Sequence, residues 1–171
     1  MDVAEFEQFL EIHEKDIYSF CRSLAMDADK ASDLYQDTVL AAFEMRGQIK
    51  VSQNPKALFF SIAVGKWRNT KRKAGRRQAI APELPLDDFT GQELAVRSEG
   101  PEGLTQSKLL RETIRQALAA LDDKFRIPLI LHYFDDYDLA CIAQICNVPK
   151  GTIKSRLHKG RALLKKSLES M

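Results

Sequence analysis

Apolar residues recur along most of this chain with the period of an α-helix. In residues 3–25 they follow one another at steps of three, four and seven, as between Ile17, Phe20 and Leu24. Such steps place the side chains on one face of a helix. No segment shows the strict alternation of a half-buried strand, so we predict an all-α protein. Further helices are expected at about 29–45, 55–76, 109–121, 123–133, 138–145 and 149–168.

Residues that favour helix starts precede several of these segments. Asp27 offers an N-cap to the second helix, and Pro55 suits the first turn of the third. Asp122 or Asp123 can cap the helix that contains Pro128, a residue that is tolerable only near a helix start. The capping residues therefore agree with the boundaries that the apolar period predicts.

Residues 78–104 differ in composition from the rest of the chain. They are acidic, show no helical period and contain several helix-breaking residues, namely Pro82, Pro85, Gly91, Gly100, Pro101 and Gly103. So long a segment without secondary structure is uncommon inside a compact domain. We therefore predict two small helical domains, 1–77 and 105–171, joined by a flexible acidic linker.

The formal net charge of +2 conceals an uneven distribution of charge. Residues 1–45 hold eleven acids and three bases, whereas residues 46–81 hold ten bases and no acid. Residues 82–103 are acidic again, and residues 149–166 hold seven bases and no acid. Two separate basic blocks indicate two contacts with a polyanion such as nucleic acid. Ordinary solvated helix faces are the alternative.

The last two predicted helices have the spacing of a helix-turn-helix. Between them lies Asn147, a residue type that tolerates the positive φ of a tight turn, and Pro149 opens the basic second helix. A recognition helix needs polar groups for base edges and cations for phosphates. The candidates for base edges are Thr152, Lys154, Ser155, His158 and Lys159, those for phosphates are Arg156 and Arg161, and Lys150 also faces outward. An ordinary amphipathic C-terminal helix is the alternative.

Two further patterns lie in the first half. Asp33, Gln36, Asp37 and Leu40 share one face of the second helix, which suits a basic helical partner, although a solvated acidic face is the alternative. The third helix ends in the run Lys66-Trp67-Arg68-Asn69-Thr70-Lys71-Arg72-Lys73. Cations interleaved with one indole and one amide suit a DNA backbone beside an opened base. The indole of Trp67 can equally well belong to the core.

These residues carry a resemblance to a known family. Residues 117–164 resemble region 4 of the extracytoplasmic-function sigma factors, small members of the sigma-70 class, and GTIKSRLHKGR is the most specific run. The run Asp33-Leu34-Tyr35-Gln36-Asp37 is similar to the one that docks on the β′ clamp helices of RNA polymerase. The basic end of the third helix and the loop 46–55 resemble the segment that recognises and melts the −10 promoter element. Gly65 and Lys66 depart from the family pattern.

The resemblance implies a sigma factor that directs core RNA polymerase to promoters and helps to open them. Region 2, residues 1–77, would bind polymerase through Asp33, Leu34, Gln36, Asp37 and Leu40. It would bind the −10 element through Gln53, Asn54, Lys66, Trp67, Asn69, Lys71 and Arg72. Region 4, residues 105–171, would bind the −35 element through the eight side chains of the recognition helix. The acidic linker would pass near the active-site cleft of polymerase and mimic nucleic acid there, or act as a plain spacer.

The resemblance also implies partners and a compartment. Besides promoter DNA, they are core RNA polymerase, through its β′ clamp helices and its β flap, and an anti-sigma factor that can be membrane-bound. We expect a monomer in the cytoplasm that does not itself insert into a membrane, because the N-terminus lacks a signal sequence and no apolar run approaches about 20 residues.

Enzymatic and metal-binding chemistry finds little support in the sequence. The three histidines do not stand in a metal-binding motif, and Cys141 and Cys146 are not spaced as a CxxC knuckle. We therefore expect no catalytic residue, no metal and no cofactor. Two rival functions remain. An autonomous helix-turn-helix regulator would bind DNA without polymerase, and a nucleic-acid-processing enzyme would need a metal or nucleophile constellation.

Overall fold

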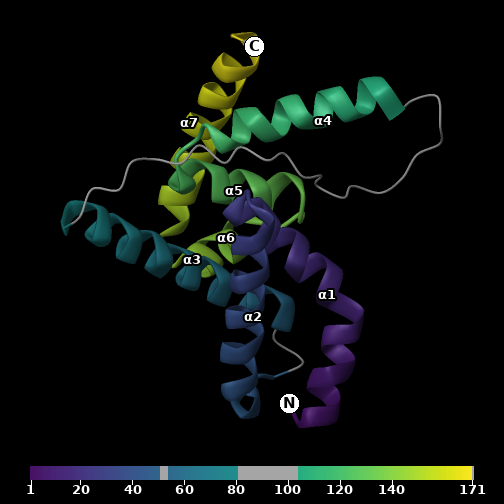
Figure 1. Ribbon diagram of the computed structural model, residues 1–171. Coiled ribbons are helices and arrows are strands. Elements are labelled where there is room, and N and C mark those ends of the chain that lie inside the picture. Colours follow the sequence, from purple (N-terminus) through teal and green to yellow (C-terminus); the bar gives the residue numbers. More distant parts are fainter. Residues whose placement is uncertain (51–53, 81–103, 171) are drawn as a thin grey trace. The chain divides into compact units, whose positions relative to one another are not determined.

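The computed structural model describes residues 1–50, 54–80 and 104–170, and these residues are helical apart from short turns and connections. The predicted all-α fold is confirmed. The chain divides into two compact units, Met1–Leu94 and Ala95–Met171 (Figure 1). No helix in the described ranges combines the length and the apolar character needed to cross a bilayer.

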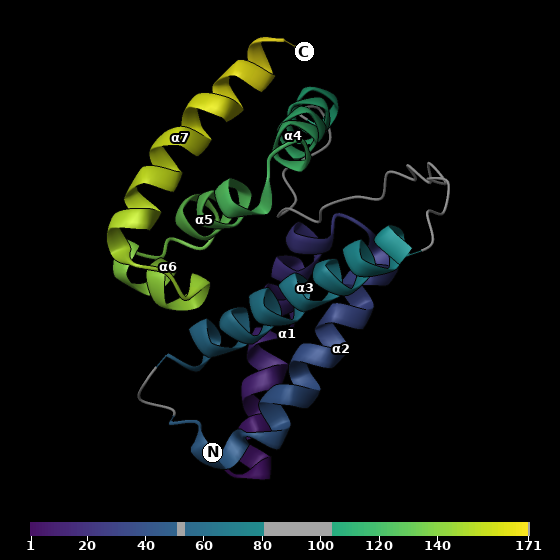
Figure 2. The same ribbon diagram turned by 90° about the vertical axis from the view of Figure 1, so that its left-hand side faces the viewer.

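The first unit is a bundle of three long helices. They are α1 (Val3–Ala25), α2 (Ala28–Glu44) and α3 (Pro55–Ile80), and the described residues after α2 include a 3₁₀ turn, η1 (Arg46–Gln48). All three helices pack against one another (Figure 2). Their core is aromatic: the rings of Phe20 and Phe60 stack with centroids 4.1 Å apart, and Phe6 and Phe9 both contact Phe59. Stacked and edge-on ring pairs add to the area that burial removes from water.

The helix starts in this unit follow the side chains that the sequence provides. Asp2 caps α1 in a capping box with Glu5, and the Asp27 carboxylate accepts a hydrogen bond from the backbone N–H of Lys30, at 2.8 Å, to cap α2. Each cap satisfies a backbone donor that the first turn of a helix leaves unpaired. An ion pair between Asp16 and Lys56, at 2.7 Å, connects α1 to the first turn of α3.

Helix α3 is longer than the sequence predicts. It continues to Ile80, four residues past the expected end at 76 and three past the expected domain edge at 77. No proline interrupts the chain before Pro82, so nothing forces the helix to end at the basic run. Residues 69–77 are all exposed, which means that this part of α3 extends beyond the core of its bundle.

Over its described residues, the second unit consists of four helices packed around a core. They are α4 (Leu104–Ala119), α5 (Asp123–Tyr133), α6 (Leu139–Cys146) and α7 (Lys150–Glu169). Asp122 caps α5, which settles the alternative between Asp122 and Asp123. Helix α5 is buried from Phe125 to Leu131 and includes Pro128, deeper inside the helix than the sequence analysis considered tolerable. Contacts with α6 and α7 hold α5 in place in spite of the backbone hydrogen bond that proline removes.

Helices α5 and α7 pack closely in this core. Gly160 of α7 is buried, and a Cβ atom added there would lie 3.1 Å from Leu129 Cδ1 and 3.4 Å from Phe125 Cβ. The absence of a side chain at Gly160 therefore allows the two helices to pack this closely.

Candidate nucleic-acid and partner-binding surfaces

The turn between α6 and α7 has the geometry that the sequence predicts. Asn147 ends α6 with φ 52° and ψ 53°, in the left-handed region, as expected for this residue type. The backbone N–H of Val148 then donates to the carbonyl of Ala143 at 3.0 Å, which closes the turn. Asp138 caps the start of α6 by accepting a hydrogen bond from the backbone N–H of Cys141 at 2.7 Å. The two helices thus form a helix-turn-helix.

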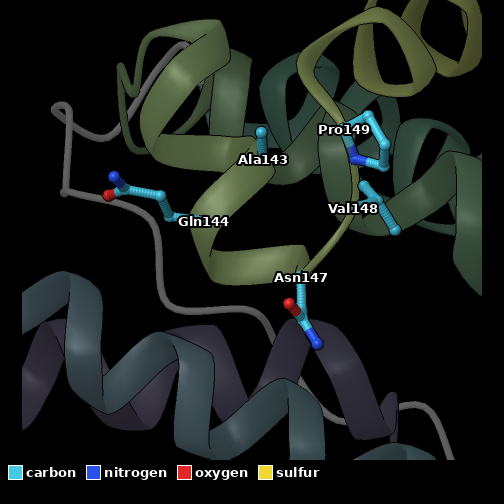
Figure 3. A pocket seen from close by; sticks show the side chains of 5 residues that line it. All are labelled: Ala143, Gln144, Asn147, Val148 and Pro149. Atoms are coloured by element: carbon cyan, nitrogen blue, oxygen red, sulfur yellow. The ribbon is translucent and has the colours of Figure 1, made fainter.

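A shallow hollow lies at this turn. Figure 3 shows its lining: Gln144 points to the left, Asn147 points down from the turn, and Val148 and Pro149 lie to the right of Ala143. Gln144 and Asn147 are exposed, so their amides face solvent next to the first turn of α7. No acidic residue stands in that first turn and no side chain caps it, which leaves the positive end of the helix dipole open to an anion.

Helix α7 separates an apolar face from a cationic one. Ile153, Leu157 and Gly160 are buried against the rest of the unit. Most of the predicted recognition side chains are exposed: Lys150, Lys154, Ser155, His158, Lys159 and Arg161. Thr152 and Arg156 are half-buried. The Ser155 hydroxyl donates to the carbonyl of Thr152 at 3.0 Å, so its oxygen remains available as an acceptor.

Arg161 stands apart from the other predicted recognition residues. Its Nε donates to the carbonyl of Leu157 at 3.2 Å, and its side chain lines an apolar groove of the second unit. The groove lies between α4, α5 and the last turns of α7, and its other lining residues are Ile114, Leu118, Leu129, Tyr133, Phe134, Leu164, Lys165, Leu168 and Glu169. Tyr133, Phe134 and Leu168 are exposed.

Sequence reasoning missed this groove. Its leucines follow the helical period. That period indicates that they are buried, but it does not distinguish burial within the chain from burial by a binding partner. The adjacent Tyr133 and Phe134, at the end of a helix and next to a turn, are the only signal that could have indicated exposed apolar surface. Exposed apolar patches of this kind are typical of interaction sites.

The basic end of α3 presents most of its predicted contact residues to solvent. Asn69, Lys71 and Arg72 are exposed, and Lys66 is half-buried. The Arg72 guanidinium donates to the side-chain oxygen of Asn69, which holds both groups on one side of the helix. No acid stands near them along the helix, because residues 46–81 contain none.

Trp67 belongs to the core. Its side chain is only 7% exposed, which favours the core alternative over the DNA-facing one that the sequence also left open. The ammonium of Lys71 lies 5.4 Å from the centroid of its ring, so the indole helps to hold a neighbouring cation instead.

The loop before α3 is described only in part. Asn54 is exposed, adopts φ 52°, and its side-chain oxygen accepts a hydrogen bond from the backbone N–H of Ala57 at 3.3 Å, so that oxygen caps α3. The amide nitrogen remains as a donor. Gln53 lies outside the described residues, as does the linker segment 81–103 with its predicted mimicry of nucleic acid.

The acidic stripe on α2, defined as Asp33, Gln36, Asp37 and Leu40, lies on one exposed face. Leu40 is 59% exposed, so it presents an apolar side chain at the end of the stripe. Leu34 is different: it is 5% exposed and belongs to the core, so the chain by itself does not present this predicted polymerase contact on its surface. Successive residues of a helix differ by about 100° in direction, so Asp33 and Leu34 diverge.

The cysteines are poorly suited to redox or metal chemistry. Burial raises the pKa of the Cys21 thiol to about 12, in spite of a side-chain hydrogen bond with Thr38. Cys141 is half-buried, and burial followed by the charge of Asp138 raises its pKa as well. Thiols with raised pKa values are weak nucleophiles and weak metal ligands at neutral pH. Over the described ranges, no three potential ligands gather into a metal site.

One unit contains a helix-turn-helix with a cationic recognition helix. The other contains a basic helix and an acidic stripe. Two such units define a modular DNA-binding protein that acts in transcription. Residues 9–77 match Sigma-70 region 2, and residues 111–164 match Sigma-70 region 4. The chain belongs to the sigma-70 family and, within it, to the extracytoplasmic-function sigma factors, which direct RNA polymerase to promoters.

Individual relatives agree with this assignment over nearly the whole chain. The ECF RNA polymerase sigma factor SigW of Bacillus subtilis is 26% identical over 99% of this chain and 92% of the relative. The ECF RNA polymerase sigma factor EcfG of Rhodopseudomonas palustris is 32% identical over 85% of this chain and 75% of the relative. The sigma factor RpoE of Bartonella quintana, solved in complex with the anti-sigma factor NepR, superposes with a TM-score of 0.81 at 27% identity, over 98% of each chain.

Proposed function

We propose that this sigma factor holds core RNA polymerase through the acidic stripe of α2 while α3 and α7 bind the −10 and −35 elements of the promoter. It performs no covalent chemistry; its contribution is the free energy of binding. The observation that carries the proposal is the exposure of Asp33, Gln36, Asp37 and Leu40 on one face of a helix whose opposite face is buried.

The stripe suits a basic helix such as those of the β′ clamp. Its two carboxylates and its amide accept hydrogen bonds, and Leu40 offers an apolar contact one turn further on. A protein interface commonly has this composition, with charged groups that select the partner and an apolar contact that contributes affinity. Leu34 acts only indirectly, by packing α2 against the bundle.

Promoter binding divides between the two units. On α3, Asn69, Lys71 and Arg72 supply cations and one amide for the −10 element, while Lys66 stands at the edge of that surface. On α7, the exposed side chains of the first ten residues face the −35 element, and the open positive end of the helix favours a phosphate. The linker, whose residues 81–103 lie outside the described structure, would let both units act on one promoter.

The apolar groove of the second unit suits an apolar helix of another protein. Its floor is leucine and aromatic side chains, and Arg161, Lys165 and Glu169 form a rim of mixed charge. We propose that the polymerase β flap occupies it in the holoenzyme. An anti-sigma factor that covered this groove or the α2 stripe would keep the chain inactive in the cytoplasm. The similarity to RpoE of Bartonella quintana, which was solved in complex with the anti-sigma factor NepR, supports a partner of that kind.

The test is runoff transcription and pull-down with core polymerase. The double variant Asp33→Lys and Gln36→Lys should abolish polymerase binding and transcription, because reversed charge would meet a basic partner. Glu11→Lys is the matched control, since Glu11 is also exposed but lies on α1 away from the stripe. Unchanged pull-down of a double variant with native circular dichroism would refute the proposal. Specific DNA binding by the chain alone, as a dimer, would favour the autonomous regulator instead.

A further inference from the structure

A pair of cations from two different helices shares one aromatic ring in the second unit. The ammonium of Lys124, in the first turn of α5, lies 5.1 Å from the centroid of the Phe125 ring. The ammonium of Lys159, on α7, lies 5.6 Å from the same centroid. Phe125 is 9% exposed, so the ring is held by the core while its remaining surface contacts the two cations.

This arrangement concentrates positive charge at the seam between α5 and α7. The ring attracts each ammonium group, but the two ammonium groups repel each other. Lys124 also stands in the first turn of a helix, where the dipole disfavours a cation. Asp122 offsets part of this charge through an ion pair with Lys124 at 3.4 Å, whereas Lys159 forms no ion pair within the described part of the chain. An external anion at the seam would relieve the repulsion.

The seam adjoins the surface of α7 that faces DNA in the proposed function. Lys159 follows His158 on the exposed side of α7, and the next residue, Gly160, is where α5 packs against that helix. The start of α5 is therefore held beside the recognition helix by the core itself. A DNA backbone that passes the edge of α7 would meet the side chains of both helices.

We propose that Lys124, on α5, contacts a phosphate of the −35 DNA in addition to the contacts made by α7. Phe125 is a positioning residue that holds the Lys159 side chain where it can contact the same DNA backbone. The proposal rests on the DNA-binding role of α7. A cation on α5, outside the recognition helix, binds phosphate without reading sequence. A ring that restricts the Lys159 side chain lowers the conformational entropy lost when DNA binds. Lys159 then acts on the backbone, where the sequence analysis placed it among the base-reading candidates.

The first experiment measures binding of the holoenzyme to promoter DNA between about 50 and 200 mM salt. Lys124→Ala should weaken binding equally for all −35 variants. Between these two salt concentrations its affinity should fall by a factor about threefold smaller than that of the wild type, as expected when one phosphate contact is removed. Lys124→Arg should retain the wild-type salt dependence because it keeps the charge. Lys166→Ala is the matched control, since Lys166 is an exposed lysine in the last turn of α7 that lines neither the apolar groove nor the proposed DNA surface.

The second experiment tests the positioning role by a double-mutant cycle. Phe125→Leu should weaken promoter binding in the wild-type background and have no further effect in a Lys159→Gln background. A merely structural role would weaken binding equally in both backgrounds. Circular dichroism and thermal melting of each variant show whether the unit remains folded.

The outcomes separate this proposal from the proposed function. If Lys154→Ala weakens promoter binding and Lys124→Ala behaves as Lys166→Ala does, the phosphate contact of Lys124 is refuted while the DNA-binding role of α7 stands. A Lys124→Ala variant with altered preference at one −35 position would also refute it, since that is the signature of a base contact. If neither Lys154→Ala nor Lys124→Ala changes promoter binding, both the proposed role of α7 and the phosphate contact of Lys124 are refuted.

Discussion

Replacing Gly160 with alanine should destabilise the second unit. Alanine in a helix interior is favoured over glycine by about 1 kcal/mol. The new Cβ, however, would lie 3.1 Å from Leu129 Cδ1 and 3.4 Å from both Leu129 Cγ and Phe125 Cβ. Leu129 is buried at the floor of the apolar groove, and Phe125 Cβ is attached directly to the α5 backbone, so no side-chain rotation moves it away. Such overpacking costs about 1–3 kcal/mol, so we expect a net loss of roughly 1 kcal/mol in the free energy of unfolding, given the alanine gain.

Gly151→Ala provides the matched control on the same helix. Gly151 is exposed and no atom lies within 4 Å of the position of its Cβ. The same propensity should therefore stabilise this variant, by less than about 1 kcal/mol because Gly151 is only the second residue of α7. Scanning calorimetry of the full chain should place the two variants roughly 10 °C apart in the transition of the second unit. Equal or greater stability of Gly160→Ala would refute the close-packing argument.

Two other predictions concern the remaining structural elements. Asp138→Ala removes the cap that accepts a hydrogen bond from Cys141 N–H. It should lower the free energy of unfolding, measured by urea denaturation, by about 1 kcal/mol. Asp138→Ser keeps a capping oxygen and should retain most of the wild-type stability. Cys21 keeps its proton up to a pKa of about 12 in the folded chain, while the unfolded thiol loses it near 9.0. The folded state then holds more protons, so its stability should fall as pH rises from about 9 towards 12. A Cys21→Ala variant whose stability fell equally over this range would contradict that cause.

Those parts of the fold that depend on local chemistry could be predicted from the sequence. The left-handed residue Asn147 and the break between α6 and α7 follow from residue types that favour particular backbone angles. The acidic stripe follows from helical spacing alone, since Asp33, Gln36 and Asp37 must share a face in any α-helix.

The parts that depend on tertiary packing could not be predicted in the same way. Trp67 stands in a run of cations, and its burial depends on how α3 packs within the bundle. Leu34 is a second example: the run from Asp33 to Asp37 resembles a surface motif as a whole, yet Leu34 within it is a core residue. The groove beneath Tyr133 and Phe134 arises only when α4, α5 and α7 come together.

Helix α7 is a single element of 20 residues, about 30 Å long at 1.5 Å per residue. The side chains proposed to meet DNA lie on its first half, and the groove-lining side chains Arg161, Leu164 and Leu168 lie on its second half. A groove ligand that prefers one packing of α7 against α5 would change the affinity for DNA, and DNA would change the affinity for that ligand by the same factor. The close contact at Gly160 permits little sliding between these helices, so strong coupling would require the groove ligand to tilt α7 as a rigid body.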